Sequence, residues 1–364
     1  MASEPKIVRV NIPGAEYNVV IQPGLLAEMG QQLRQVSEAK KAALITDTHV
    51  GLLYAEKAEE SLQKAGFEVI PATVPTGEQN KTIQTIASIY DQVLPFEVDR
   101  STPLVALGGG VVGDMTGFAA ATILRGVPFV QVPTTLLSMV DASVGGKTGI
   151  DHALGTNLIG AFHQPKGVFI DPAVLKTLPP RDLRSGLAEC IKHDIIRDAE
   201  GFAELEKNIK RAIDLDVEYL AELVAHNVGI KAKVVESDPF EKGERAHLNF
   251  GHTFGHAIES VSGFSYAHGE GVALGMVAAA RAAVALGMLD EPGMQRIVKL
   301  IQSTGLPTGG LKLNVDRVVA SMNYDKKVKS GKIRFVLPTQ IGSVVIKDDV
   351  PTEVVKKAVE SLKN

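Results

Sequence analysis

The chain is poor in cysteine and aromatic residues: it has one cysteine, Cys190, and no tryptophan among 364 residues. A single cysteine excludes an intrachain disulfide framework and a cysteine-rich zinc site, which favours a reducing compartment. No apolar run approaches the roughly 18 uncharged residues of a membrane helix, and the N-terminal residues lack the apolar core of a signal peptide. We therefore expect a cytoplasmic protein with no membrane partner.

Neither sign of charge dominates, because the formal net charge is only -4. This balance gives no basic footprint for nucleic acid, so we expect no nucleic-acid partner, and an anionic small molecule would have to be held by local clusters of cations.

Single hydrophobic cores stop growing at about 250 to 300 residues, so a chain of 364 residues predicts two domains.

Strand and helix patterns alternate in the first half of the chain, whereas helical periodicity dominates after Pro179. The first-half strand patterns cover residues 7–12, 17–22, 42–47, 67–74, 103–107, 128–133 and 167–171. The first two form a predicted hairpin, and two late strands are expected at 333–338 and 342–347. The sequence predicts an α/β N-terminal domain with a Rossmann-like, mainly parallel sheet over residues 1–179, and a mostly α-helical C-terminal domain over residues 180–364.

A glycine-rich turn follows the apolar strand that begins at Pro103. Gly108, Gly110 and Gly113 satisfy the G-x-G-x-x-G pattern before a helix. Glycines let backbone N–H groups approach a pyrophosphate, and the helix N-terminus favours its negative charge, although a tight structural turn would show the same pattern. Asp47 ends an earlier strand and could accept from a ribose hydroxyl, but carboxylates at strand ends are also common without a ligand.

Residues 144–148, VGGKT, invite comparison with a nucleoside-triphosphate loop. That loop requires a glycine six residues before its lysine, and Asp141 occupies this position, which disfavours an ATPase. Lys147 still follows paired glycines in a polar segment. It suits contact with a small anionic or hydroxylated ligand, and a solvated lysine is the alternative.

Three histidines and an asparagine, Asn249, lie between residues 246 and 271. Helical spacing puts His252 and His256 on one face, and His268 can return to them from the next helix. Such clustering favours a divalent-metal site over solvated or core histidines. A zincin protease has a glutamate directly after its first histidine, and Thr253 occupies this position, so a protease of this kind is disfavoured.

An earlier helix carries Glu189 and Lys192 three residues apart. A surface ion pair is the usual explanation of this spacing. If Glu189 instead joins the histidines, two imidazoles and one carboxylate leave coordination positions open, as in catalytic zinc sites.

Several ordered motifs resemble one known family, the 3-dehydroquinate synthases. They are LVALGGGVVGDMTGFAAATILRG, VQVPTTLLSMVDASVGGKTG, GLAECIK, LNFGHTFGHAIE and AHGEGVALGM. The resemblance covers residues 41–346. It implies an NAD-dependent lyase with one divalent ion, Zn²⁺ or Co²⁺, and with its active site in the cleft between its two domains. It also implies a homodimer. The implied reaction converts 3-deoxy-D-arabino-heptulosonate 7-phosphate to 3-dehydroquinate and phosphate by transient oxidation, phosphate elimination, re-reduction and aldol closure.

The resemblance also implies residue roles. The metal ligands would be Glu189, His252 and His268, which leaves His256 as an acid/base residue and replaces the helix-face hypothesis that pairs it with His252. The other catalytic residues would be Lys147, Lys192, Arg245 and Asn249. NAD contacts would be Asp47, Glu78, Lys81, Gly109, Gly110, Val111, Asp114, Thr134, Thr135, Lys147 and Thr177. Substrate contacts would be Arg125, Asp141, Asn157, Lys231 and one of Lys326 and Lys327.

Three residues depart from the family pattern: Thr156 stands where a lysine is usual, and His49 and Ser185 stand where an asparagine is usual. All three fall at expected NAD contacts. They bear on cofactor affinity more than on the reaction.

Two other enzyme classes compete with this interpretation. A cyclase of the 2-epi-5-epi-valiolone synthase type acts on a substrate without the carboxylate, and such relatives usually change the residue matching Asn249. A metal-dependent polyol dehydrogenase needs no clustered cations of the kind expected here. Nothing in the sequence argues for a non-enzymatic binding module.

Overall fold

The structure is a computed structural model that describes residues 4–241, 243–322 and 333–364. The chain divides into two compact units. The first comprises Met1–Leu178 and Val217–Glu236, and the second comprises Pro179–Asp216 and Ser237–Asn364. The domains expected from sequence, 1–179 and 180–364, are each one continuous segment. In the structure, the chain instead returns to the first unit at Val217–Glu236. Helical periodicity at 217–236 does not reveal which core the helix packs against.

The first unit is built on a mainly parallel sheet. Its strands, in spatial order, are β1 (Lys6–Val10), β2 (Tyr17–Ile21), β9 (Val168–Ile170), β6 (Phe129–Pro133), β5 (Leu104–Gly108), β3 (Lys41–Asp47) and β4 (Glu68–Val74). The β1–β2 hairpin is antiparallel, and the other pairs are parallel. The predicted α/β class is confirmed. Every residue of β5 is buried, as expected for a central strand covered on both faces.

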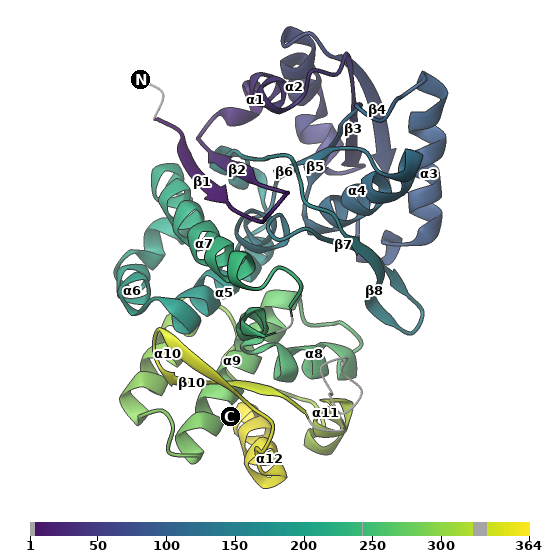
Figure 1. The fold of residues 1–364 in the computed structure, drawn as a ribbon. Coiled ribbons are helices and arrows are strands. Elements are labelled where there is room, and N and C mark those ends of the chain that lie inside the picture. The colour runs from purple at the N-terminus through teal and green to yellow at the C-terminus, as the bar shows by residue number, and fades with distance from the viewer. Residues whose placement is uncertain (1–3, 242, 323–332) are drawn as a thin grey trace. The chain divides into compact units, whose positions relative to one another are not determined.

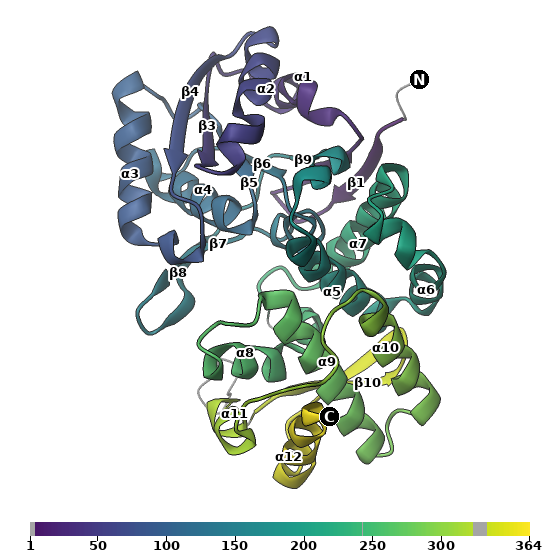
Figure 2. The same cartoon turned by 180° about the vertical axis from the view of Figure 1, so that it is seen from behind.

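Helices cover both faces of this sheet. On one face lie α1 (Met29–Val36) and α2 (Val50–Lys64), and on the other lie α3 (Ile83–Val93) and α4 (Gly110–Thr122) (Figures 1 and 2). Ile45, Ile70 and Ile86 belong to the core between the sheet and the α3–α4 face. Short 3₁₀ helices connect these elements: η1 (Leu25–Ala27), η2 (Glu78–Asn80), η3 (Leu94–Phe96), η4 (Ile123–Arg125) and η6 (Pro172–Thr177).

Two elements of the first unit were not expected from the sequence. A π-helical turn, η5 (Ser138–Ala142), follows β6, and a hairpin of β7 (Lys147–His152) and β8 (Gly155–Phe162) comes next. β7 packs on α4. Gly117 permits this approach, because a Cβ there would lie 2.3 Å from Cγ2 of Thr148.

Helix α7 (Val217–Ser237) is tied to the first unit by polar contacts. Glu236 accepts hydrogen bonds from the backbone N and from Nδ2 of Asn11, at 2.6 and 3.1 Å. Lys231 forms an ion pair with Asp141 on η5 and also donates to its carbonyl.

The second unit is mostly helical, as predicted, and its described residues include one antiparallel strand pair. Its elements are α5 (Pro180–Arg197), α6 (Ala199–Ile213), η7 (Glu244–Asn249), α8 (His252–Val261), α9 (His268–Ala285), α10 (Glu291–Ser303), α11 (Val315–Met322), β10 (Phe335–Gln340), β11 (Ser343–Lys347), α12 (Thr352–Glu360) and η8 (Ser361–Lys363). Helix α9 packs against α5, α8, α10 and α12 (Figure 2). Its central residues, 271–280, are all apolar or glycine and all buried, which suits a helix segment covered on every side.

Helices α8 and α9 approach closely through glycines. A Cβ on Gly255 would lie 2.8 Å from the carbonyl oxygen of Gly271, and one on Gly275 would lie 1.9 Å from that of Gly251. Larger residues would force the helices apart.

Within the described residues, no helix is both long and apolar enough to span a membrane.

Candidate metal and nucleotide sites

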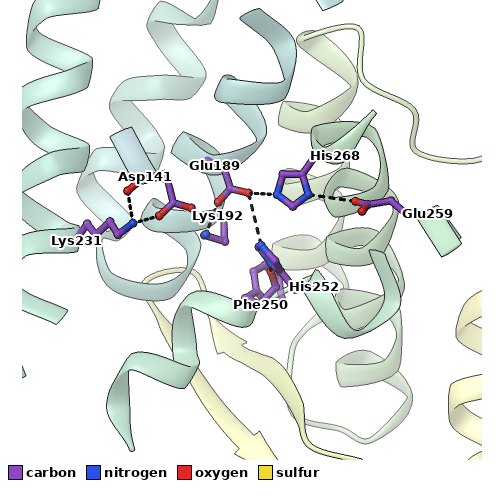
Figure 3. A network of polar contacts seen from close by, with 8 residues as sticks. All are labelled: Asp141, Glu189, Lys192, Lys231, Phe250, His252, Glu259 and His268. Atoms are coloured by element: carbon purple, nitrogen blue, oxygen red, sulfur yellow. Dashed lines mark hydrogen bonds and ion pairs between the residues drawn. The ribbon is translucent and has the colours of Figure 1, made fainter. Parts of the chain in front are cut away.

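Three side chains of the second unit converge on one point. Glu189 lies on α5 and is fully buried, while His252 and His268 are the first residues of α8 and α9. Nε2 of His268 lies 3.4 Å and Nε2 of His252 lies 3.7 Å from Oε1 of Glu189 (Figure 3). Ligand atoms about 2.0–2.1 Å from a tetrahedral ion lie roughly 3.3 Å apart. The donor set and its spacing therefore fit one divalent ion.

Hydrogen bonds at the opposite ring nitrogens orient both imidazoles. Nδ1 of His252 lies 3.1 Å from the carbonyl oxygen of Phe250, and Nδ1 of His268 lies 3.2 Å from Oε1 of Glu259. A carbonyl or an ionised carboxylate oxygen can only accept, so each Nδ1 carries the proton. Each Nε2 is thereby aimed at Glu189.

Charge around this cluster is dense. Lys192 forms an ion pair with Oε2 of Glu189, and both side chains are buried. Burial disfavours the charged imidazolium of His268, but the hydrogen bonds and charges of Glu189 and Glu259 outweigh it and raise the pKa of His268 to about 10. Without a metal, the ring of His268 therefore carries protons on both nitrogens at neutral pH. A metal ion bound at Nε2 must displace the proton on that nitrogen, while the Nδ1 proton stays in the hydrogen bond to Glu259.

His256 lies one turn after His252 on α8. Its ring centroid is 5.2 Å from that of His252 and 6.1 Å from that of His268. His256, Glu259 and His268 also hold ligand atoms within 4.8 Å of one another, as do Glu189, His252 and His268. The structure brings all three histidines together, and Glu189 groups with His252 and His268.

Arg245 and Asn249 precede these histidines on η7. Nη1 of Arg245 donates to the carbonyl of Pro239 at 2.7 Å, and Nδ2 of Asn249 donates to Glu241 at 3.2 Å. The guanidinium of Arg245 is buried, and its Nη1 is held by the Pro239 carbonyl.

The sequence did not single out Glu241 or Glu259 as residues of the site. Glu259 could have been found, because it lies seven residues after His252 on the same helical face.

The glycine turn of the first unit lies between β5 and α4. Helix α4 begins at Gly110, and a Cβ on Gly109 would approach Cγ2 of Thr135 to 3.2 Å. Oγ1 of Thr134 is buried and has no hydrogen-bond partner among the described residues. A glycine-opened helix N-terminus with an adjacent unsatisfied hydroxyl fits the pyrophosphate of a dinucleotide.

A pocket of about 340 Å³ lies beside the end of β3 and includes Thr46, Asp47, Gly51 and Ala72 in its lining. Oδ1 of Asp47 accepts from the backbone N of His49 and of Val50, at 2.8 and 2.9 Å. Its size and the carboxylate of Asp47 at the end of a parallel strand suit a nucleoside, and Glu59 also lines the pocket. A larger pocket, of about 500 Å³, lies beside Tyr266 and Lys312 of the second unit, and no expected site residue lines it.

Lys81 joins expected cofactor and substrate contacts in one network. Its Nζ donates to Asp114 at 2.7 Å and to Asn157 at 2.6 Å, and lies 3.6 Å from Glu78. Burial opposes the charge of Lys81, but Asp114 and Glu78 outweigh it and raise the pKa of the ammonium. The same burial raises the pKa of Asp114 against the effect of Lys81. The hairpin residue Asn157 is thus fixed to the segment before α3.

The remaining expected residues are dispersed. Thr177 hydrogen-bonds the hydroxyl of Tyr54 at 2.6 Å, and Lys147 is exposed at the start of β7. Arg125 lies past the far end of the 13-residue α4, so a helix length of roughly 20 Å separates it from Gly110. Arg125 is therefore not brought together with the glycine turn. Lys326 and Lys327 lie outside the described residues.

Comparisons with known proteins agree on the family. The N-terminal model of 3-dehydroquinate synthase matches residues 71–185, and the C-terminal model matches residues 186–328. A 3-dehydroquinate synthase of Microcystis aeruginosa is 51% identical over 353 residues, which are 96% of this chain and 96% of that protein. One of Nostoc punctiforme is 48% identical over 360 residues, covering 98% and 99%. The chain belongs to the 3-dehydroquinate synthase family. The resemblance inferred from the motifs is confirmed.

Solved structures agree with the fold. A 2-epi-5-epi-valiolone synthase of Streptomyces hygroscopicus, with NAD⁺ and Zn²⁺ bound, has a TM-score of 0.88 at 30% identity and covers 95% of this chain and 96% of that one. A 2-deoxy-scyllo-inosose synthase has a TM-score of 0.90 at 24% identity, covering 98% and 100%, and shows likeness of fold alone. A glycerol dehydrogenase of Schizosaccharomyces pombe is more distant, with a TM-score of 0.67 at 18% identity, covering 95% and 88%.

Proposed function

We propose that this chain is a 3-dehydroquinate synthase, a phosphate-eliminating carbon–oxygen lyase. Its substrate would be 3-deoxy-D-arabino-heptulosonate 7-phosphate, and its products 3-dehydroquinate and phosphate. The observation that carries the proposal is the grouping of Glu189, His252 and His268 in a chain nearly half identical, over almost its full length, to relatives of that name.

We propose NAD and one divalent ion, Zn²⁺ or Co²⁺, as cofactors. The glycine turn, the unsatisfied Thr134 hydroxyl and the pocket at Asp47 support NAD in the first unit. The proposed metal ligands, Glu189, His252 and His268, all belong to the second unit. When bound, NAD would take up and return a hydride at C5 of the substrate, and the ion would make the C5 hydroxyl more acidic.

The remaining polar groups suit a substrate with a phosphate, a carboxylate and several hydroxyls. Lys147, Lys192, Lys231 and Arg245 are cations, and Asn249 adds an amide. Arg245 is anchored through Nη1, which fixes the plane of a guanidinium group suited to a carboxylate or phosphate. His256 would hold and move the proton of the C5 hydroxyl.

We further propose a homodimer located in the cytoplasm. The homodimer is implied by the family resemblance, and the cytoplasmic location is supported by the single cysteine, Cys190. Light scattering on the purified protein would measure the assembly, and a monomer at micromolar concentration would contradict it.

The decisive test follows phosphate and NADH in the same sample. With the heptulosonate phosphate, Zn²⁺ or Co²⁺ and a catalytic amount of NAD, we expect one phosphate per substrate over many turnovers and no accumulation of NADH at 340 nm. A polyol dehydrogenase would give one NADH per substrate oxidised and no phosphate.

One observation favours a second candidate, because the similar 2-epi-5-epi-valiolone synthase structure superposes closely. Such an enzyme would prefer the corresponding sugar phosphate without the carboxylate. Higher kcat/KM for that substrate would reassign the activity. The retained Asn249 and the higher identity to the 3-dehydroquinate synthases argue for the first candidate.

A further inference from the structure

Glu259 contacts the metal-binding cluster but has no part in the function proposed so far. It lies on α8 and is only 9% exposed. Its Oε1 is 3.2 Å from Nδ1 of His268, across the interface between α8 and α9 (Figure 3). A carboxylate is costly to bury unless it is bonded in this way.

The space for this carboxylate depends on a glycine. A Cβ on Gly271, one turn after His268 on α9, would lie 2.6 Å from Oε1 and 2.8 Å from Cγ of Glu259. Gly255 in turn lets the backbones of the two helices meet at Gly271. The close packing of α8 on α9 thus places a buried carboxylate against a single imidazole nitrogen.

The two histidines of the cluster are held by different acceptors. His252 donates from Nδ1 to the neutral carbonyl of Phe250, whereas His268 donates to the carboxylate of Glu259. Hydrogen bonds to an ionised acceptor are about twice as strong as those between neutral groups. A carboxylate partner also makes the distant ring nitrogen a better electron donor to a metal.

We propose that Glu259 is a positioning residue for His268: by accepting the Nδ1 proton it fixes the ring and directs Nε2 to the metal ion. This inference rests on the metal ligands of the proposed function. Glu259 acts through the imidazole and touches neither ion nor substrate.

The alternative is that Glu259 is itself a metal ligand. His256, Glu259 and His268 could together hold a second ion, since their ligand atoms lie within 4.8 Å of one another. The positioning role requires one ion per chain, because Nδ1 of His268 is then occupied by its proton.

Metal titration of wild type and Glu259→Gln tests the proposal without substrate or NAD. The glutamine keeps the shape and removes the charge. We expect Zn²⁺ or Co²⁺ affinity, measured by competition with a chelator, to fall about 10- to 100-fold. At saturating Co²⁺, the visible absorption bands should shift because His268 becomes a weaker donor. Glu206→Gln is the matched control: it removes a carboxylate of the same unit that pairs with Arg296, and it should leave metal affinity unchanged.

Gly271→Ala supplies a second variant in which no charge is removed. Its methyl group would meet the flexible Glu259 carboxylate, so that carboxylate should move and metal affinity should fall as in Glu259→Gln. Circular dichroism would verify that both variants fold.

Unchanged affinity and an unchanged Co²⁺ spectrum in folded Glu259→Gln would overturn the proposal. Two ions per wild-type chain, with one lost in Glu259→Gln, would overturn it in favour of direct ligation. Weakened metal binding in a protein that releases no phosphate would support this inference and contradict the proposed function.

Discussion

His252 and His268 present the same ring nitrogen to the same oxygen of Glu189. His256 stands beside them but groups with Glu259 in place of Glu189. The cluster thus contains two kinds of histidine, although the sequence presents three similar ones. The difference in contacts leads to different expected effects of substitution.

Replacing His268 by alanine should remove bound metal and activity together, because a proposed ligand is lost. His256→Ala should keep the metal and lose about 10²- to 10⁴-fold in kcat, the usual contribution of a general acid or base. Elemental analysis and steady-state kinetics measure the two quantities. Equal loss of metal in both variants would show that the roles are assigned wrongly.

Thr156 is exposed on β8, next to the Asn157 that accepts from Lys81. Because related enzymes usually have a lysine here, Thr156→Lys should tighten NAD binding. A gain of about 1 kcal/mol, roughly fivefold in Kd, is expected for one added charged hydrogen bond. Titration calorimetry measures it, with Thr156→Gln as an uncharged control. Equal or weaker binding in the lysine variant would mean that the hairpin meets the cofactor differently.

Helix α9 begins at the proposed ligand His268, and Glu270 secures this helix end. Glu270 accepts from the backbone N of Ala267 at 2.8 Å and from Nε and Nη2 of Arg181 at 2.9 and 2.6 Å. The hydrogen bond from Arg181 is the main cause that lowers the pKa of Glu270. A carboxylate near a helix N-terminus also complements the helix dipole.

A lowered carboxyl pKa makes a contribution to stability that depends on pH. The contribution is fully present above the unfolded value near 4.5 and is lost as the pH falls through the folded value. Glu270→Gln should therefore be less stable than wild type at pH 7, and the difference should shrink below about pH 4.5. Urea unfolding at several pH values checks this, and a difference that stays constant with pH would exclude the ionised contact.

The elements that could be predicted from sequence are those with local signals. The apolar strand that ends in Gly108 and Gly110 predicts the turn into α4, and the structure has it. The π-helical turn η5 and the β7–β8 hairpin were not predicted. β8 is almost wholly exposed and lacks the apolar alternation that marks a strand, and the contact at Gly117 depends on residues 31 positions away. The role of Glu259 was missed for a similar reason, since only the packing of α8 on α9 places it on His268.

For the whole chain, the sequence predicted the α/β and helical classes, but no local pattern shows which unit helix α7 joins. Helix α7 belongs to the first unit through Asn11 and Asp141, which are separated from their partners by 225 and 90 residues. No local pattern encodes such contacts. The second unit is consequently built from two segments, and the proposed metal ligands lie on both: Glu189 on the first, and His252 and His268 on the second.

Because a bound ion would join these two segments, it should stabilise the second unit as a whole. At a free concentration 100 times Kd, a ligand that binds only the folded state contributes about 2.7 kcal/mol. For a unit of this size, that corresponds to a rise in Tm on the order of 5–10 °C. We expect a chelator to lower the Tm of wild type by this amount and to leave His268→Ala unchanged. Calorimetry with and without Zn²⁺ provides the measurement. Equal shifts in both proteins would show that the ion acts elsewhere on the chain, because only the folded arrangement of Glu189, His252 and His268 distinguishes this site from scattered histidines of the unfolded state.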